Sequence, residues 1–277
     1  MSLDLDRVAE AASALPRAFV KSPQYRSESL SRLLGVELIL KVETTNPTGS
    51  AASRGAEWWF ECNPTTHRVV CASADDFGTA MAYAGRTRGV EVELFGPIDS
   101  DAAKVELLRH SGTIVRLDGR DADEARAEAR RYSALVDGLF VDDGEHDELA
   151  EGSATLVAEI GDLPHEIDAI FVPVGRGSLA HGTGAWCHAR MPRTRVVGVE
   201  MPVSASADPP VISLTDALDD TALVNDRHLE QASAALLRHE GIRASMDGSA
   251  ALAAAALAAP DMRGAVVVVP VTGRAVG

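Results

Sequence analysis

A glycine-rich segment, VPVGRGSLAHG at residues 172–182, has the residue types to bind an anionic group. Its apolar start predicts a strand, which runs into a tight turn and then into a helix. A helix N-terminus offers unpaired backbone N–H groups and the positive end of a dipole, and both favour a phosphate. The candidate phosphate-binding residues are Gly175, Arg176, Gly177, Ser178 and Leu179. A turn that needs glycine only for its backbone angles would give the same pattern.

A second strand, turn and helix start is predicted at CASADDFGTAMAYAG, residues 71–85. The residues of its turn are Ser73, Ala74, Asp75, Asp76 and Phe77. The turn amides could hold a carboxylate, but the two adjacent aspartates oppose this use because their charge lies where an anion would dock. Ser73 and either aspartate would also serve as plain helix caps, so both interpretations stay open.

The apolar run VVVVPV at residues 266–271 predicts a buried strand that ends at Thr272. Ligands of α/β folds bind at the carboxyl edge of the sheet, so the Thr272 hydroxyl is a candidate partner for a ligand ring nitrogen. The alternative is a polar strand end without a ligand. The three cysteines lie far apart and the histidines lack metal-ligand spacing, so we predict neither a metal site nor a disulfide.

The 277-residue chain has a formal net charge of -15, from 41 acidic and 26 basic residues. A field of this sign repels nucleic acid and anionic membranes, so we expect neither as a partner. The N-terminus lacks the basic and apolar segments of a secretion signal, and no run of about 18 apolar residues predicts a membrane span. With its dispersed cysteines, the chain is expected to be a cytoplasmic protein.

Short apolar runs alternate with amphipathic stretches of helix length along most of the chain. The strand candidates include VELILKVE, RVVCAS, VEVELFGP and AIFVPVG. This alternation is typical of parallel sheets covered by helices on both faces. We therefore predict an α/β fold with two open-sheet lobes, a large one from residues 1–45 and 146–277 and a small, mobile one from residues 46–145. The ligand cleft is expected between the lobes.

The order and spacing of these segments resemble the fold-type II pyridoxal-phosphate (PLP) enzymes, the tryptophan synthase β-like group. Within that group the sequence is most similar to threonine/serine dehydratases, serine racemases and threonine synthases. Members carry a Ser-Phe-Lys-x-Arg-Gly-Ala segment whose lysine binds the cofactor. Residues 46–56 read NPTGSAASRGA, which places Ser50 at the serine and Ala52 at the lysine position.

The same resemblance assigns roles to the other segments. Asp76 matches a family asparagine that bonds the phenolic oxygen of the cofactor, and the residues matching the turn that holds the substrate carboxylate are Ser73, Ala74, Asp75 and Phe77. The stretch 175–179 matches the phosphate loop, with Arg176 and Ser178 in place of glycines. Thr272 matches the residue opposite the pyridine nitrogen. The large lobe would then be the PLP-type lobe, with the cofactor cleft beside it.

The resemblance implies an amino-acid lyase of the threonine/serine dehydratase or β-replacement kind, a homodimer acting on a small amino-acid-like substrate. That chemistry needs the lysine both to present PLP and to move the α-proton. Alanine does neither, so the chain as written is expected to be inactive in it. Ala52 is explained by engineered replacement or by natural divergence. Further departures at Ala51, Asp75 and Asp76 favour divergence, whereas the retained glycine loop favours replacement.

The alternative hypothesis is a cofactor-free pseudoenzyme, or a pocket that uses Asp75 and Asp76 to bind or transform another small molecule. Two close carboxylates push their pKa values apart, which suits one as an acid and the other as a base. The candidate catalytic residues are therefore Ser50, Asp75, Asp76 and, as the lysine position, Ala52. Uptake of PLP by the chain separates the two hypotheses.

Overall fold

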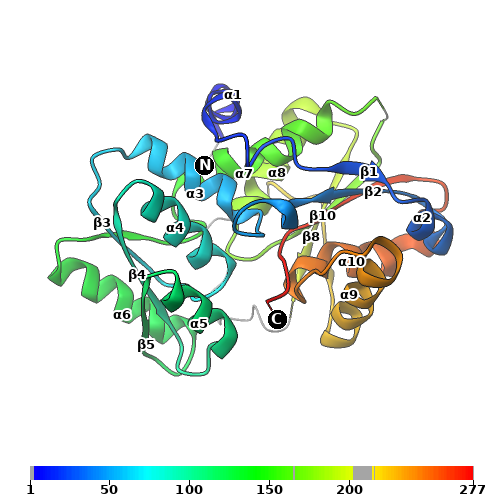
Figure 1. Cartoon of the computed structure of the whole chain (residues 1–277). Helices are drawn as coiled ribbons and strands as arrows, with labels where there is room; N and C mark the ends of the chain where they lie inside the picture. Colours follow the sequence, from blue (N-terminus) through cyan, green and yellow to red (C-terminus); the bar gives the residue numbers. More distant parts are fainter. Residues whose placement is uncertain (1–2, 165, 202–213, 215, 277) are drawn as a thin grey trace.

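The computed structural model describes residues 3–164, 166–201, 214 and 216–276. These residues form two open β-sheets with helices packed on their faces (Figure 1). The arrangement agrees with the α/β fold predicted from the alternation of apolar and amphipathic segments. The strands of the smaller sheet lie within the range 46–145, and the mobility expected of that range stays a prediction.

The larger sheet has six strands in the order β1, β2, β10, β7, β8, β9. The bounds of these strands are β1 Gln24–Arg26, β2 Glu37–Val42, β10 Val266–Val271, β7 Ala169–Pro173, β8 Arg195–Glu200 and β9 Asp220–Leu223. Strand β1 is antiparallel to β2, and the other neighbours pair in parallel. Strands β2, β7 and β10 are almost wholly buried, which explains their continuous apolar sequences.

Two groups of helices cover the faces of the larger sheet (Figure 1). The helices on one face are α7 (Asp147–Gly161) and α8 (Ser178–Arg190), and those on the other are α2 (Glu28–Leu34), α9 (Asp226–Glu240) and α10 (Ala250–Ala258). Successive strand residues alternate between the two faces: Ile170 contacts the α7 and α8 side, and Phe171 contacts the other. Each face therefore has a separate hydrophobic core.

The smaller sheet has four parallel strands in the order β5, β4, β3, β6. Its elements are β3 Arg68–Cys71, α4 Asp76–Thr87, β4 Glu91–Gly96, α5 Ala102–His110, β5 Ile114–Leu117, α6 Ala122–Leu135 and β6 Leu139–Val141. The remaining elements are α1 Leu5–Ala14, α3 Ala52–Cys62 and the short 3-10 turns η1 Glu43–Thr45, η3 Asp247–Ser249 and η4 Ala259–Asp261. Strands β3, β6, β7 and β10 each end in a turn that contributes to the pocket described below.

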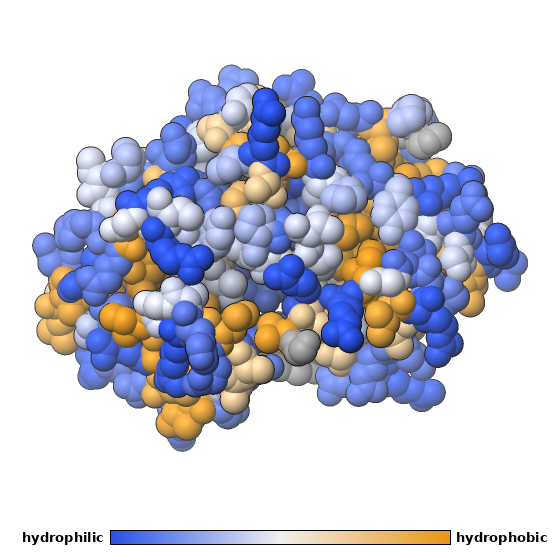
Figure 2. All heavy atoms as spheres, viewed as in Figure 1, coloured by the Kyte–Doolittle hydropathy of each residue, from blue (hydrophilic) through white to orange (hydrophobic). Residues whose placement is uncertain are grey.

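The face shown in Figure 2 is mainly hydrophilic, with apolar residues in scattered patches. Exposed large apolar side chains come from different elements, among them Leu33 on α2, Leu107 on α5 and Leu257 on α10. Within the described residues, no helix is both long and apolar enough to cross a membrane.

Helices α3 and α7 approach so closely that glycine is required where they meet. A Cβ atom at Gly152 would lie 2.4 Å from the backbone oxygen of Arg54, and one at Gly55 would lie 2.7 Å from the backbone oxygen of Leu149. Both obstacles are backbone atoms, which cannot turn aside as a flexible side chain can. The contact fixes the start of α3 against the larger sheet, because α7 packs on that sheet.

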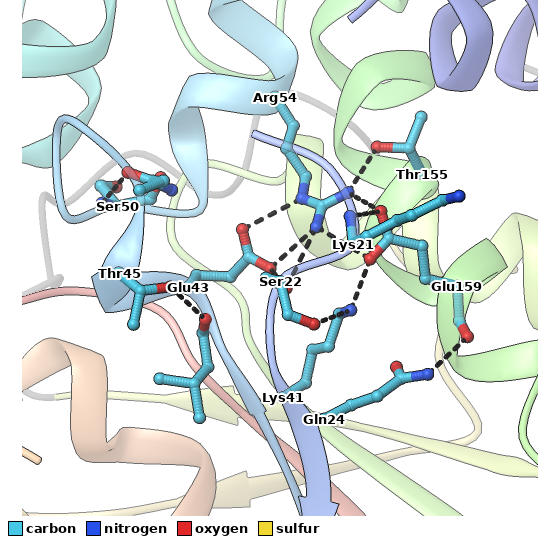
Figure 3. Close-up of polar contacts among 12 residues, drawn as sticks. Lys21, Ser22, Gln24, Lys41, Glu43, Thr45, Ser50, Arg54, Thr155 and Glu159 are labelled. Atoms are coloured by element: carbon cyan, nitrogen blue, oxygen red, sulfur yellow. Dashed lines mark hydrogen bonds and ion pairs between the residues drawn. The ribbon is translucent and has the colours of Figure 1, made fainter. Parts of the chain in front are cut away.

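Arg54 is fully buried and forms the centre of an ion network (Figure 3). Its guanidinium lies 2.9 Å from Glu43 Oε1 and 2.7 Å from Glu159 Oε1. The buried Lys41 pairs with the same Glu159 and donates to the backbone oxygen of Ser22 at 3.0 Å. The network links α3 to η1, β2 and α7, so it ties the start of α3 to the larger sheet through compensated buried charges.

Gly152→Ala tests the close approach of α3 and α7. We expect the free energy of unfolding to fall by about 1–3 kcal/mol, because the added methyl group forces two helix backbones apart. Gly161→Ala on the same helix is the control, since its Cβ would meet nothing closer than 3.5 Å, and it should be neutral or slightly stabilising. Urea unfolding measures both, and equal effects would contradict the account.

Arg54→Met tests the buried network. Removal of the guanidinium leaves the buried Glu43 without its cation and leaves Glu159 with Lys41 alone, so the free energy of unfolding should fall by about 3–5 kcal/mol. Arg195→Met breaks the exposed Arg195–Asp220 pair and should change stability by less than about 1 kcal/mol. Chemical denaturation of the two variants measures the contrast, and a small effect at Arg54 would show that the network does not hold α3.

Candidate functional site

A pocket of about 380 Å³ lies where the carboxyl ends of strands from both sheets face each other. Its walls come from the start of α3, the turns after β3, β6 and β7, the end of β10 and the η3 turn. The predicted site residues that line it are Ser50, Ala52, Ser73, Asp75, Asp76, Phe77, Gly175, Arg176, Ser178, Leu179 and Thr272. Ala74 and Gly177 lie in the same turns but do not line the pocket. Four predicted segments therefore meet at the pocket, and the role of each residue stays a prediction.

Ala52 is the first residue of α3 and lines the pocket together with the glycine loop and Thr272. Its backbone N–H donates to Ser50 Oγ at 3.2 Å. None of the described residues that line the pocket is a lysine. Lys104 of α5 contacts one of the lining residues, with its Nζ 3.3 Å from Asp76 Oδ1. The wall where the family motif places an amine therefore carries a methyl group.

The turn between β7 and α8 keeps features of an anion site. Gly175 and Gly177 have φ values of 52° and 125°, which glycine adopts without strain, and a Cβ atom at Gly175 would meet nothing within 4 Å. The buried Nε of Arg176 has no hydrogen-bond partner among the described residues. The terminal nitrogen of the same guanidinium, however, lies 3.2 Å from Asp142 Oδ2.

Two aspartates that the sequence analysis did not single out face this turn. Asp142 and Asp143 follow β6, and Asp142 also pairs with Arg126 at 2.6 Å. Burial raises the pKa of Asp143 to about 6, and the charges of Asp142 and Asp75 add to the effect, against the Ser178 hydroxyl and Arg176, which lower it. Burial also raises the pKa of Asp142. The signal was present in the sequence, as two acids at the end of the predicted strand GLFVDD.

The turn after β3 is closed by its own side chains. Ser73 Oγ accepts hydrogen bonds from the backbone N–H groups of Gly78 at 2.9 Å and Asp75 at 3.4 Å. Asp75 Oδ1 accepts from the Phe77 N–H at 3.0 Å, so Asp75 is the N-cap of α4. Three amides that could have held a substrate carboxylate are thus already bonded. Of the two interpretations of this turn, the structure favours capping.

Asp76 is the second acid of that turn and points toward the large-sheet side of the pocket. A Cβ atom at Gly273, which follows β10, would lie 2.3 Å from Asp76 Oδ2, so a side chain there would displace the Asp76 carboxylate. Burial raises the pKa of Asp76 to about 6; Asp75 and Asp247 add to the effect, and Lys104 opposes it. Lys104 and Asp247 were not predicted from the sequence, because their approach depends on how α5 and η3 pack.

The comparisons with known proteins agree with this arrangement. The model of the pyridoxal-phosphate dependent enzyme family matches residues 16–273, and the chain belongs to that family. A protein of Sinorhizobium fredii named as a candidate threonine dehydratase is 28% identical over 92% of this chain and 86% of its own length. The L-threonine dehydratase IlvA of Escherichia coli is 30% identical over 66% of this chain but only 36% of its own length.

A solved structure gives the same fold over the whole length. The serine racemase of Dictyostelium discoideum superposes with a TM-score of 0.86, covers 100% of both chains and is 21% identical. The predicted fold class, two open α/β sheets of the fold-type II PLP enzymes, is confirmed. At this level of identity the likeness shows the fold, and the activity of this chain has to be argued from its own residues.

The residues of the pocket do not fit PLP as a resident group. The described lining residues offer no lysine amine for covalent attachment, and an acid, Asp76, stands where the family motif has a neutral asparagine. Five aspartates and two arginines line the described walls, and both arginines pair with Asp142. A phosphate at the glycine turn would lie beside Asp143 and a phenolate beside Asp76, and like charges at close range disfavour binding. No reaction step is therefore derived through this cofactor.

Asp143→Asn tests the electrostatic cost of the pocket. Because the pKa of Asp143 is raised to about 6, the folded chain holds this proton more tightly than the unfolded chain does. Ionised Asp143 therefore lowers stability above about pH 6, and this cost disappears below about pH 4, where the carboxyl is protonated in both states. We expect the variant to melt at a higher temperature than the parent at pH 8 and at a similar temperature near pH 4.

Glu124→Gln provides a control of opposite sign. A hydrogen bond from Arg120 lowers the pKa of Glu124 to about 2, so its ionised form adds stability that is present above about pH 4.5 and lost as the pH falls through 2. This variant should melt below the parent at pH 8. Thermal unfolding followed by circular dichroism measures the melting temperatures of both variants. A melting-temperature difference between Asp143→Asn and the parent that does not change with pH would contradict the raised pKa of Asp143.

Proposed function

We propose that the chain as written binds a small molecule in this pocket and does not catalyse the lyase reaction typical of its family. The family is PLP-dependent, and the named relatives are threonine dehydratases, so an amino-acid lyase of the dehydratase or β-replacement kind is the related activity. The observation that carries the proposal is Ala52 on the pocket wall, with no lysine among the described lining residues. We also propose that the chain forms a homodimer, as the family resemblance implies.

Removal of an α-proton needs a base held at the reacting carbon, and in this family motif the base is the lysine. Ala52 has no group that accepts a proton, and the Ser50 hydroxyl beside it already accepts the Ala52 N–H. Lys104 cannot replace the missing base without giving up Asp76, the acid that its ammonium neutralises. The chain therefore keeps a cavity large enough for a small molecule, and the described residues that line it do not include the lysine base of the family reaction.

One observation favours a second candidate, a pocket that performs acid–base chemistry of its own. The pKa values of Asp76 and Asp143 are both raised to about 6. Near that pH each carboxyl group is partly protonated, so it can either donate or accept a proton. Asp75 is less suited to this role than the sequence suggested, because its carboxylate is used as the α4 cap. Asp76 and Asp143 are thus the acid and base of this alternative.

Titration with PLP tests the proposal on the chain as written and on Ala52→Lys. The chain as written should show no absorbance from covalently bound cofactor and no release of ammonia from serine or threonine. If Ala52 marks the lost attachment point, the lysine variant should gain that absorbance, because its amine would enter the pocket from the start of α3. Ala9→Lys, at an exposed position of α1, is the matched control and should gain nothing.

Two results would contradict the proposal. Ammonia release from serine by the chain as written, with PLP present, would show that another group supplies the base. Equal uptake by Ala52→Lys and Ala9→Lys would show that position 52 is not the attachment point.

A further inference from the structure

The charge of the pocket indicates which small molecule it takes, given the proposed function. The first sign is the turn after β3, where an incoming carboxylate would need free amides. Asp75 Oδ1 already accepts the Phe77 N–H, and Ser73 Oγ accepts the N–H of Gly78. The carboxylate of Asp75 thus takes the place of a ligand anion, and a second anion there would meet its negative charge.

The second sign is the glycine turn before α8. Its backbone geometry suits an anion, but the Ser178 hydroxyl faces the carboxylate of Asp143 and Arg176 is paired with Asp142. Asp143 lines the same pocket, so its negative charge lies beside the place where a phosphate would dock. Both anion sites that the family motifs suggest are therefore countered by acids of this chain.

The third sign is the opposite wall, where Asp76 and Asp247 line the pocket from α4 and η3. Lys104 pairs with Asp76 and is also close enough to Asp247 to lower its pKa against the effect of burial, so one ammonium is shared by two carboxylates. Within the described part of the chain, no group of acids, histidines or cysteines is arranged to hold a metal ion. An organic cation matches this chemistry better than a metal does.

Neutral groups complete the lining. Ser50, Ser153 and Thr272 line the pocket as hydroxyl-bearing residues, and Phe77 and Leu149 line it as apolar ones. Hydroxyl groups can donate to or accept from a ligand hydroxyl without any cost in charge. A volume of about 380 Å³ lies within the range of small-molecule sites and leaves ample room for an amino alcohol or a small diamine.

We infer that the pocket takes a small primary ammonium compound that carries no carboxylate or phosphate, with its ammonium among the aspartates and its hydroxyl on the serine and threonine side. Such a ligand has the amine of an amino acid without the carboxylate, for which the turn after β3 has no room. The pocket would thus recognise a cation at the place where the family motifs recognise anions, within the same fold.

Calorimetry with matched compounds tests this inference. Ethanolamine and L-serine share the amine and the hydroxyl and differ by the carboxylate, and inorganic phosphate probes the glycine turn alone. Ethanolamine should bind roughly tenfold or more tightly than L-serine, and phosphate should not bind, because each added anion faces fixed carboxylates. Equal or tighter binding of L-serine or phosphate, or no binding of ethanolamine, would overturn the inference.

Two variants locate the effect. Asp143→Asn removes one pocket charge, and Asp75→Asn removes another while keeping a side chain that caps α4 equally well. Each should weaken ethanolamine binding by roughly tenfold, the loss expected for one close charge pair. Asp4→Asn makes the same change at the exposed cap of α1 and should leave binding as it was. Unchanged ethanolamine binding in both pocket variants would exclude a role of these carboxylates.

The two proposals fail in different experiments. Turnover of serine by the chain as written would refute the proposed absence of lyase chemistry, whatever ethanolamine does. If the chain shows no turnover and ethanolamine binds no better than L-serine, cation recognition alone is refuted.

Discussion

The buried guanidinium of Arg54 is the interaction on which the pocket depends. It holds Glu43 of η1 and Glu159 of α7 from the first turn of α3, while Gly55 and Gly152 let α3 and α7 touch. A buried charge stays compensated only if its partners keep their geometry. The Arg54 network and the close contact of α3 with α7 together fix the start of α3. The side chain at position 52 therefore faces the same cavity whether it is a lysine or an alanine.

On this fixed frame, the chemistry of the pocket is set by charge. The cavity keeps the glycine turn and the carboxyl-edge threonine of a PLP enzyme fold, yet acids come to it from three separate segments: Asp75 and Asp76, Asp142 and Asp143, and Asp247. Lys104 and two arginines offset their charge only in part. Electrostatic complementarity contributes to which partners such a site selects. On the proposed function, this chain keeps the fold of its PLP-dependent family and differs from it in the charge of the pocket.

The parts that could be predicted from the sequence are those encoded locally. Continuous apolar runs such as 266–271 indicated buried parallel strands, and glycines and aspartates after strands indicated the turns at 175–179 and 73–77. The partners of Asp76 could not be found in this way, because Lys104 and Asp247 reach it only through the packing of α5 and η3. The function of Asp75 also depended on geometry, since capping and catalysis require the same residue type.

The amount of PLP that stays with the purified chain tests the central claim most directly. Chain produced in cells that make the cofactor would be denatured, and the released PLP would be quantified by mass spectrometry against the protein concentration. The account predicts cofactor far below one molecule per chain, because the lining residues that the structure describes have no amine to attach it and several carboxylates to repel it. Cofactor near one molecule per chain would contradict the account and would restore the pocket as a PLP site.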